Sequence, residues 1–220
     1  MLHVFCIGSL TVGWSLGASS EITAETGTLW WLVANVDDDS VFDKHLATIE
    51  DSVGDDQTSQ FHHLTGATCQ AINLQKIITR IKRRAATEDT LVFLFRSQIT
   101  KPSDSNQIYF SVADDRLISS YQINQWLKGI NSIVLLDCFT TDANLDTFYA
   151  NRQLLGAAAI VSIFGQSLAE TPNLNLVSRL ASILSGPFDG SPKVDLNDNR
   201  QLTLHEVYDA LVSDFSHPGI

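Results

Sequence analysis

The sequence is poor in cysteine and in basic residues, and each shortage argues against a class of protein. Its 220 residues include 3 cysteines, too few and too scattered for a disulfide framework or a metal knuckle. We therefore expect a reducing compartment and a cytoplasmic location. Only 14 Lys and Arg stand against 25 Asp and Glu, so the net charge is −11. This charge argues against nucleic acid or an anionic membrane as the partner of the surface as a whole.

Long apolar runs are also missing from the sequence. None reaches the roughly 18 residues that a membrane-spanning helix needs, so we expect no membrane partner. The first 20 residues have an apolar middle and a small-residue end, as signal peptides do, but they contain no Lys or Arg. Without a positively charged start, we do not expect this segment to direct export.

The remaining composition is that of an ordinary globular protein. Hydrophobic residues make up 44% of the chain and charged residues 18%. A chain of this length can bury a full core and is expected to form one domain. We expect residues 29–220 to be that domain, and residues 1–28 to be an N-terminal extension, either an arm or an extra hairpin.

Short apolar runs alternate with amphipathic segments along the chain. The expected strands cover residues 29–36, 60–64, 91–95, 108–112, 133–137 and 157–164. The expected helices cover residues 41–50, 71–85, 120–127, 143–155, 174–184 and a last segment that ends at 211. This alternation predicts an α/β fold with a mostly parallel sheet.

Two of the apolar runs end in polar residues where a functional site is expected. The run from Leu91 to Phe95 continues into Arg96-Ser97-Gln98-Ile99, and the run from Ile133 to Leu136 continues into Asp137-Cys138-Phe139-Thr140. In open α/β sheets, ligands bind at the carboxyl ends of the strands. The sequence therefore predicts that any site lies where these two strands end.

The segments DTLVFLFRSQI and VLLDCFTTD resemble the centre of the caspase-like cysteine peptidases, which include caspases, metacaspases and prokaryotic relatives. In that family the first strand runs into Ser-Gly-His-Gly, and its His is the general base. The second strand runs into a small residue and then the nucleophilic Cys. Here Gln98 stands at the histidine position and Phe139 at the cysteine position.

The resemblance covers about residues 29–211 and implies a doubly wound, mostly parallel sheet flanked by helices on both faces. Asp89, Asp137 and the turn from Leu64 to Thr68 match the supporting scaffold of the family. The two catalytic positions do not match. The resemblance therefore implies a catalytically inactive pseudo-peptidase that acts as a protein-binding, scaffolding or regulatory subunit in a signalling, cell-death or conflict system. Such a subunit needs a protein partner or a second copy of itself, and no cofactor.

Two other functions remain open at this point. An active cysteine peptidase could use Cys138 as a displaced nucleophile, with His62 or His63 as its base. A shift of one residue along a strand turns the side chain to the opposite face, so we expect Cys138 to be a packing residue instead. The second alternative is a small-ligand sensor that uses the vacated pocket.

The stretch from Asp195 to Glu206 has oxygen-bearing side chains at the spacing of an EF-hand loop. Arg200 occupies the position where the sharp turn of such a loop requires glycine. Thr203 and Glu206 also form a capping-box pattern, which explains the same residues as the start of a last helix. We therefore expect no calcium site and no other metal site.

Five of the 14 basic residues lie in the expected helix of residues 71–85: Lys76, Arg80, Lys82, Arg83 and Arg84. Cations near a helix C-terminus interact favourably with the helix dipole. We interpret them as a solvated helix end rather than a phosphate-binding patch.

Overall fold

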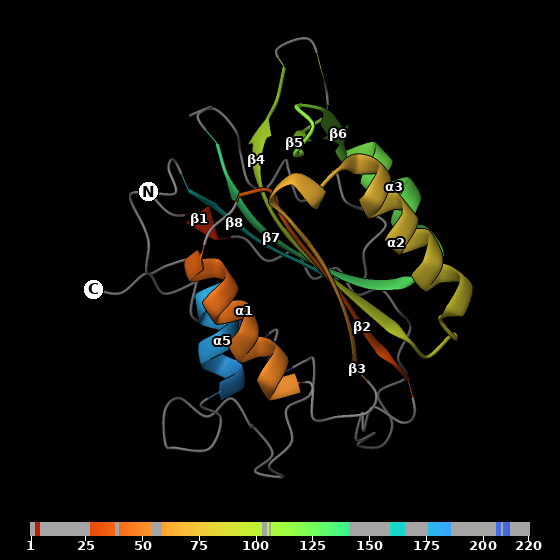
Figure 1. The fold of residues 1–220 in the computed structure, drawn as a ribbon, viewed down its shortest axis with the longest axis vertical. Coiled ribbons are helices and arrows are strands. Elements are labelled where there is room, and N and C mark those ends of the chain that lie inside the picture. Colours follow the sequence, from red (N-terminus) through yellow and green to blue (C-terminus); the bar gives the residue numbers. More distant parts are fainter. Residues whose placement is uncertain are drawn as a thin grey trace.

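The computed structural model describes residues 3–4, 27–37, 40–53, 59–102, 105, 107–140, 159–165, 176–185, 206–207 and 209–211. These residues form an α/β fold around a mixed, open sheet whose main path has six strands, in the order β1-β8-β7-β4-β2-β3 (Figure 1). The strands are β1 (His3–Val4), β2 (Leu29–Asn35), β3 (Ser59–Thr65), β4 (Thr90–Thr100), β7 (Asn131–Phe139) and β8 (Ala159–Gly165). Two short strands, β5 (Tyr109–Ser111) and β6 (Leu117–Ser119), extend from β4 as an antiparallel hairpin.

All neighbours from β3 to β8 run parallel, and only β1 joins the main path antiparallel. The strand order reverses between β2 and β4, because β2 is followed by β3 on one side and the later strands continue on the other. The carboxyl ends of β2, β4 and β7 therefore meet at one edge of the sheet. In parallel sheets this is the end at which ligands bind.

Helices cover both faces of the sheet. Helices α1 (Ser40–Val53) and α5 (Leu176–Ser185) lie together on one face, and α2 (Ala71–Arg84) and α3 (Ser120–Leu127) lie on the other (Figure 1). Alternate strand residues point to opposite faces, so the sheet contributes to two separate cores. The α2/α3 face buries Trp30, Leu32, Leu91, Phe93, Phe95, Val134, Leu136 and Cys138; the α1/α5 face buries Trp31, Val33, Val92, Leu94 and Leu135.

The amphipathic spacing of the helices explains these layers. In α2, Leu74, Ile78 and Ile81 recur at helical spacing and are fully or almost fully buried, while the basic residues of the last turn stay outside. In α1, Phe42, Leu46 and Ile49 do the same on the other face. Ser119 begins α3 by accepting a hydrogen bond from the Gln122 N–H at 3.2 Å, and the Gln122 side chain accepts from the Ser119 N–H.

Asp89 ties the amino ends of β2 and β4 together. Its buried carboxylate accepts hydrogen bonds from the Thr28 N–H at 2.6 Å, the Trp30 Nε1–H at 3.0 Å and the Ala86 N–H at 3.0 Å. Burial alone would raise the pKa of Asp89, but these three hydrogen bonds outweigh it and hold the pKa below its usual value. Gly27 passes this point so closely that an added Cβ would overlap the backbone carbonyl of Glu88.

The two site strands run further than their apolar runs predict. β4 continues past Phe95 to Thr100, and β7 continues past Asp137 to Phe139. The segment after Phe95 contains no glycine, and its Ile99 pairs with Phe110 of β5. The segment therefore continues as a strand. Residues expected on a loop are therefore held inside the sheet.

Several segments differ from the expected elements or lie outside the described residues. The short strand β6 lies where no element was expected, between the expected strand of residues 108–112 and the expected helix of residues 120–127. Near the N-terminus, His3 and Val4 pair with Phe164 and Ile163 of β8, at the edge of the sheet. The expected helix of residues 143–155, residues 5–26 of the expected N-terminal extension and residues 195–205 lie outside the described residues. Within the described part of the chain, no helix is long and apolar enough to cross a bilayer.

Candidate functional site

Gln98 and Phe139 lie side by side where β4 and β7 reach their carboxyl ends. The two residues are paired Cα partners in the parallel ladder, and both side chains are half-buried. They share the α1/α5 face of the sheet, because Gln98 is in phase with Val92 and Leu94. The structure therefore brings together the two positions, distant in the chain, that the resemblance to caspase-like proteins identified.

Cys138 points to the other face of the sheet. It belongs to the α2/α3 core together with Leu136, and only 3% of its surface is exposed. Its Sγ donates a weak hydrogen bond to the Phe95 carbonyl at 3.8 Å. Burial, with the nearby charge of Asp137 as a second cause, raises the pKa of the Cys138 thiol well above its usual value. A thiol in this environment is protonated at neutral pH and has no open path to a substrate.

The histidines whose side chains are described cannot serve Cys138 as a base. His62 and His63 lie on β3, and β2 and β4 separate that strand from β7. Three strand spacings correspond to about 14 Å, and His62 is also out of register with Cys138 by four residues. His45 belongs to α1, on the opposite face of the sheet. A nucleophile and its base must lie within hydrogen-bond reach, and no described histidine does.

Two residues before Gln98 and Phe139 along their strands, a row of polar side chains crosses three strands. Asn35, Arg96 and Asp137 are consecutive Cα partners on β2, β4 and β7. Their exposed fractions are 0%, 4% and 6%, although the positions that precede them on this face, Val33, Leu94 and Leu135, are apolar. The row lies at the point where the strand order reverses. This buried row was the part of the site that sequence reasoning missed, although an Arg and an Asp at the ends of two apolar runs were its signal.

The members of this row are held by contacts with the strands and with α1. Arg96 Nη1 donates to Asp137 Oδ2 at 3.2 Å, and the guanidinium lies 5.3 Å from the ring centroid of Phe42. A cation over an aromatic face is favoured, most strongly where water is excluded. Asn35 Oδ1 accepts a hydrogen bond from the Asp37 N–H at 3.1 Å, while its buried Nδ2 has no hydrogen-bond partner among the described residues.

The described side chains at this end of the sheet offer hydrogen bonds, charge and apolar surface. The Gln98 amide donates and accepts hydrogen bonds, and Phe139 offers only apolar surface. The Arg96 guanidinium supplies positive charge and hydrogen-bond donors. The Asp137 carboxylate on the same face is bonded to Arg96.

The turn that follows β3 reaches the same end of the sheet. Gly66 begins the short 3₁₀ helix η1 (Gly66–Thr68) with a φ of +46°, a conformation that glycine adopts without strain. The Thr68 hydroxyl accepts from the Thr65 N–H at 2.9 Å and donates to the Thr65 carbonyl at 2.8 Å. These bonds make the turn a rigid connection into α2.

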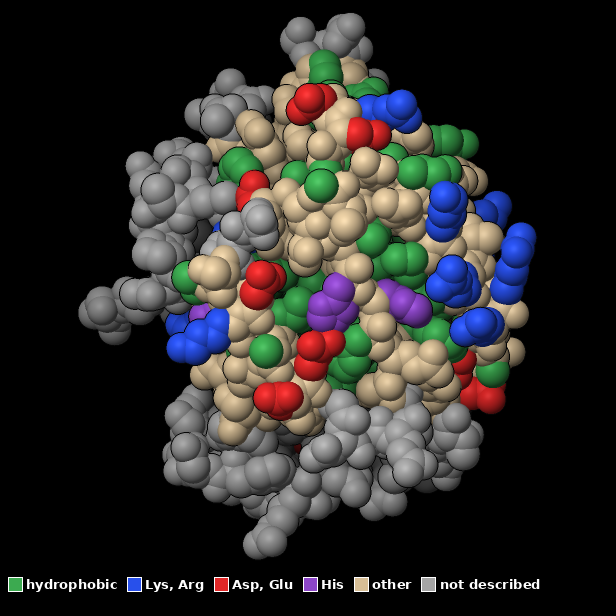
Figure 2. Space-filling model, in the orientation of Figure 1, with side chains coloured by type: hydrophobic (Ala, Val, Ile, Leu, Met, Phe, Trp, Pro, Cys, Tyr) green, Lys and Arg blue, Asp and Glu red, His purple; other side chains and the backbone are tan. Residues whose placement is uncertain are grey.

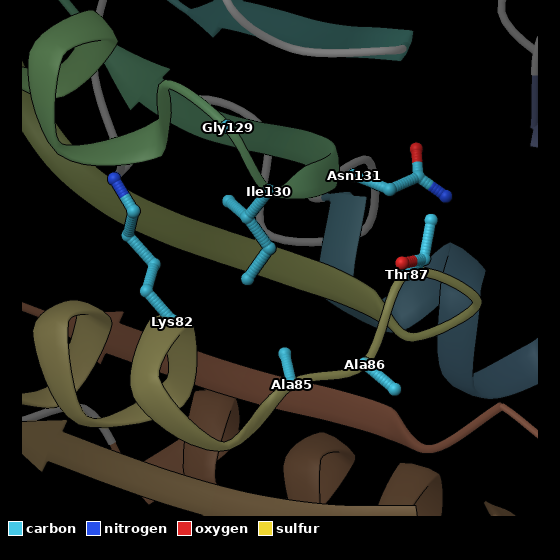
Figure 3. A pocket seen from close by; sticks show the side chains of 7 residues that line it. All are labelled: Lys82, Ala85, Ala86, Thr87, Gly129, Ile130 and Asn131. Atoms are coloured by element: carbon cyan, nitrogen blue, oxygen red, sulfur yellow. The ribbon is translucent and has the colours of Figure 1, made fainter.

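A cavity of about 290 Å³ lies near the opposite ends of the strands, between the segment after α2 and the segment after α3 (Figure 3). Its polar groups are already used. Lys82 Nζ donates to the carbonyls of Trp126 and Lys128, at the end of α3, and Asn131 Nδ2 donates to Thr90 Oγ1. The Lys82 and Asn131 side chains that line the cavity therefore already have hydrogen-bond partners within the protein. The cavity also lies at the amino ends of the strands, which is not where α/β sheets bind ligands.

Among the residues that the structure describes, no three His, Cys, Asp or Glu side chains group as metal ligands would. Of the stretch from Asp195 to Glu206, which has the spacing of an EF-hand loop, only Glu206 is described, and it is 5% exposed within a helical segment. The other described cysteine, Cys69, is fully buried, and burial raises the pKa of its thiol to about 12.

Comparison with protein-family models and with curated proteins finds no match to this sequence.

Proposed function

We propose that the chain is a caspase-like pseudo-peptidase that acts as a protein-binding, scaffolding or regulatory subunit. The observation that carries the proposal is the pairing of Gln98 with Phe139 on adjacent parallel strands, at the two positions where the family has its His and Cys. The two positions that the resemblance pairs lie 41 residues apart in sequence and are neighbours in the sheet, which supports the proposal. On this proposal the chain keeps the arrangement of the two strands and has lost the chemistry of both positions.

The arrangement of the sheet supports the same proposal. Five parallel strands in the order β3-β2-β4-β7-β8, with helices on both faces, are the order expected of a doubly wound sheet. Asp137 is buried at the end of β7 and bonds with Arg96, which is a structural role rather than a catalytic one. A protein that keeps this scaffold without a nucleophile needs a binding surface as its output.

The test of inactivity compares the wild type with Cys138→Ala on a library of fluorogenic peptides that carry acidic or basic residues before the scissile bond. We expect neither protein to cleave any peptide above the buffer rate, because the Cys138 thiol is buried and has no described base near it. Cleavage by the wild type that Cys138→Ala abolishes would make Cys138 a displaced nucleophile and would overturn the proposal.

The test of binding is affinity capture of the full chain from its native host, followed by identification of what co-purifies. We expect a stable protein partner or a second copy of the chain. Empty capture, together with a monomeric mass by light scattering, would contradict a scaffolding or regulatory role.

A small-ligand sensor is the second candidate, and the unpartnered Nδ2 of Asn35 favours it. A fully buried amide donor without an acceptor costs free energy that a ligand oxygen could recover. The test is a thermal-shift screen with small carboxylates on wild type and on Asn35→Leu, which keeps the volume but removes the donor. A carboxylate that raises the Tm of the wild type alone would favour the sensor, and no shift with any of them would count against it.

A further inference from the structure

The outer edge of β3 and the basic face of α2 beside it form one continuous surface, which we call the β3–α2 surface. β3 ends the sheet, and it pairs with β2 over all seven of its residues. Among the described residues, no strand pairs with its outer side. At the other end of the sheet, β1 occupies part of the edge of β8.

The β3 edge lacks the features that usually protect an open strand. Its sequence, SQFHHLT, contains no Lys, no Pro and no Gly, and its register with β2 has no bulge. Proteins normally blunt such edges, because unpaired N–H and C=O groups are a template for another strand. A long, regular, unprotected edge is therefore suited to pairing with another chain.

The neighbouring helix concentrates positive charge in a protein whose net charge is negative. Lys76, Arg80 and Arg84 recur four residues apart along α2 and are exposed. No acidic side chain among the described residues forms an ion pair with them, and like charges at this spacing repel each other. In a protein with a net charge of −11, this uncompensated stripe indicates an anionic partner.

The stripe borders the strand directly. Arg80 and Arg84 lie close enough to His62 of β3 to lower its pKa, in addition to the larger effect of burial. Figure 2 shows Lys and Arg side chains gathered over α2, histidines in the middle of this face, and acidic side chains over α1 on the other side. Of the latter, Glu50 bonds with His63 of β3.

We propose that the β3–α2 surface binds an extended acidic segment of a partner protein, which adds to β3 as a strand and turns its carboxylates toward Lys76, Arg80 and Arg84. This inference rests on the proposed function as a binding subunit and names the chemistry of its partner. Alternate side chains of an added strand point to opposite faces, so the partner needs acidic residues at every second position. The remaining positions face α1 and must be uncharged or basic.

A nucleic acid fits this surface less well than a peptide does. The basic stripe is one helix wide, and the acidic residues over α1 flank the strand on its other side (Figure 2). A polyanion that is charged on all sides would contact both the basic stripe and the acidic residues over α1, whereas a strand with one acidic face turns its charges only toward the stripe.

The probe for this proposal is a fluorescein-labelled peptide of four Glu-Val repeats, measured by fluorescence anisotropy in about 50 mM salt. We expect it to bind the wild type, and Arg80→Glu with Arg84→Glu to weaken binding by about tenfold or more, because the attraction becomes repulsion. The matched control is Arg116→Glu with Lys128→Glu. It makes the same change in net charge at exposed residues outside the β3–α2 surface.

Three further probes separate a paired strand from loose electrostatic attraction. A Ser-Val repeat, which can form the strand but carries no carboxylates, should bind about tenfold or more weakly, and an eight-residue oligothymidylate should bind far more weakly than the Glu-Val peptide. A Glu-Val peptide with N-methylated backbone amides should lose about tenfold or more in affinity, because it cannot complete the ladder. Circular dichroism melts show that each variant is folded before its affinity is compared.

The proposal is overturned if the Glu-Val peptide does not bind at millimolar concentration, if the control variant weakens binding as much as the Arg80 and Arg84 variant, or if the N-methylated peptide or the oligothymidylate binds equally well. The outcome is separable from that of the proposed function. A native partner whose capture survives Arg80→Glu with Arg84→Glu would leave the scaffold function standing and remove this surface as its docking site.

Discussion

At the scale of single residues, a buried ion pair and two uncharged side chains mark the site end of the sheet. Arg96 and Asp137 form the pair at 3.2 Å, and Gln98 and Phe139 lie two residues further along the same strands. A buried ion pair costs desolvation energy and contributes little net stability, but the loss of one partner is strongly destabilising. This pair therefore positions the ends of β4 and β7 relative to each other and to α1.

We predict that Arg96→Met lowers the free energy of unfolding by about 3 kcal/mol, because the Asp137 carboxylate stays buried without its guanidinium. The double variant Arg96→Met with Asp137→Leu should be more stable than the sum of the single effects implies. The measurement is a double-mutant cycle by urea unfolding, with an expected coupling of about 1–3 kcal/mol. Strictly additive effects would show that the two side chains do not depend on each other.

At the scale of elements, the hydrogen bonds of Asp89 join the start of β2 to the segment between α2 and β4. Two of the three donors are backbone N–H groups, at Thr28 and Ala86. The carboxylate therefore accepts hydrogen bonds that strand pairing would otherwise accept. Removing it would leave buried donors unsatisfied. The role of Asp89 is to fix how the two strands that flank the reversal of strand order enter the sheet.

We predict that Asp89→Asn lowers the free energy of unfolding by about 2 kcal/mol at pH 7. The pKa of Asp89 is depressed in the folded state, so its contribution is complete above the unfolded pKa of about 3.9 and is lost as pH falls through the folded pKa. Urea unfolding at pH 7 and at decreasing acid pH should show the gap between wild type and variant closing toward low pH. A gap that stays constant would show that the charge of Asp89 is not what stabilises the joint.

At the scale of the whole molecule, the two edges of the sheet differ. β8 receives His3 and Val4 along part of its outer side, and β3 receives no strand from the described residues. Because β1 lies along part of the β8 edge, β3 is the more open edge among the described residues.

We predict that removal of residues 1–26 increases self-association of the chain, because it uncovers the edge of β8. Multi-angle light scattering of the full and shortened chains at matched concentrations measures this directly. Equal masses for both would show that β1 does not protect the edge. A loss of folded signal on shortening would show instead that the first residues belong to the core domain, against the expected boundary at residue 29.

The sequence by itself determined the elements and their layers. Periodicity in segments such as Ala71–Arg84 and apolar runs such as Leu29–Asn35 depend on local spacing, so the helices, the parallel strands and the Ser119 cap follow from it. The resemblance to caspase-like proteins identified Gln98 and Phe139, each three residues beyond the end of an apolar run. The opposite orientation of Cys138 followed from the two-residue period of a strand, and the structure places it in the other core.

Only the tertiary structure decided which residues meet. Asn35, Arg96 and Asp137 are far apart in the chain, and no local pattern states that β4 lies between β2 and β7 with these three in register. The continuation of β4 to Thr100 depends on its pairing with β5, which a single-strand pattern does not contain. From the sequence, Lys76, Arg80 and Arg84 are interpreted as part of a solvated helix end. The structure adds that the open edge of β3 lies beside them. Strand order and register are set by contacts between distant segments, and those contacts exist only in the folded chain.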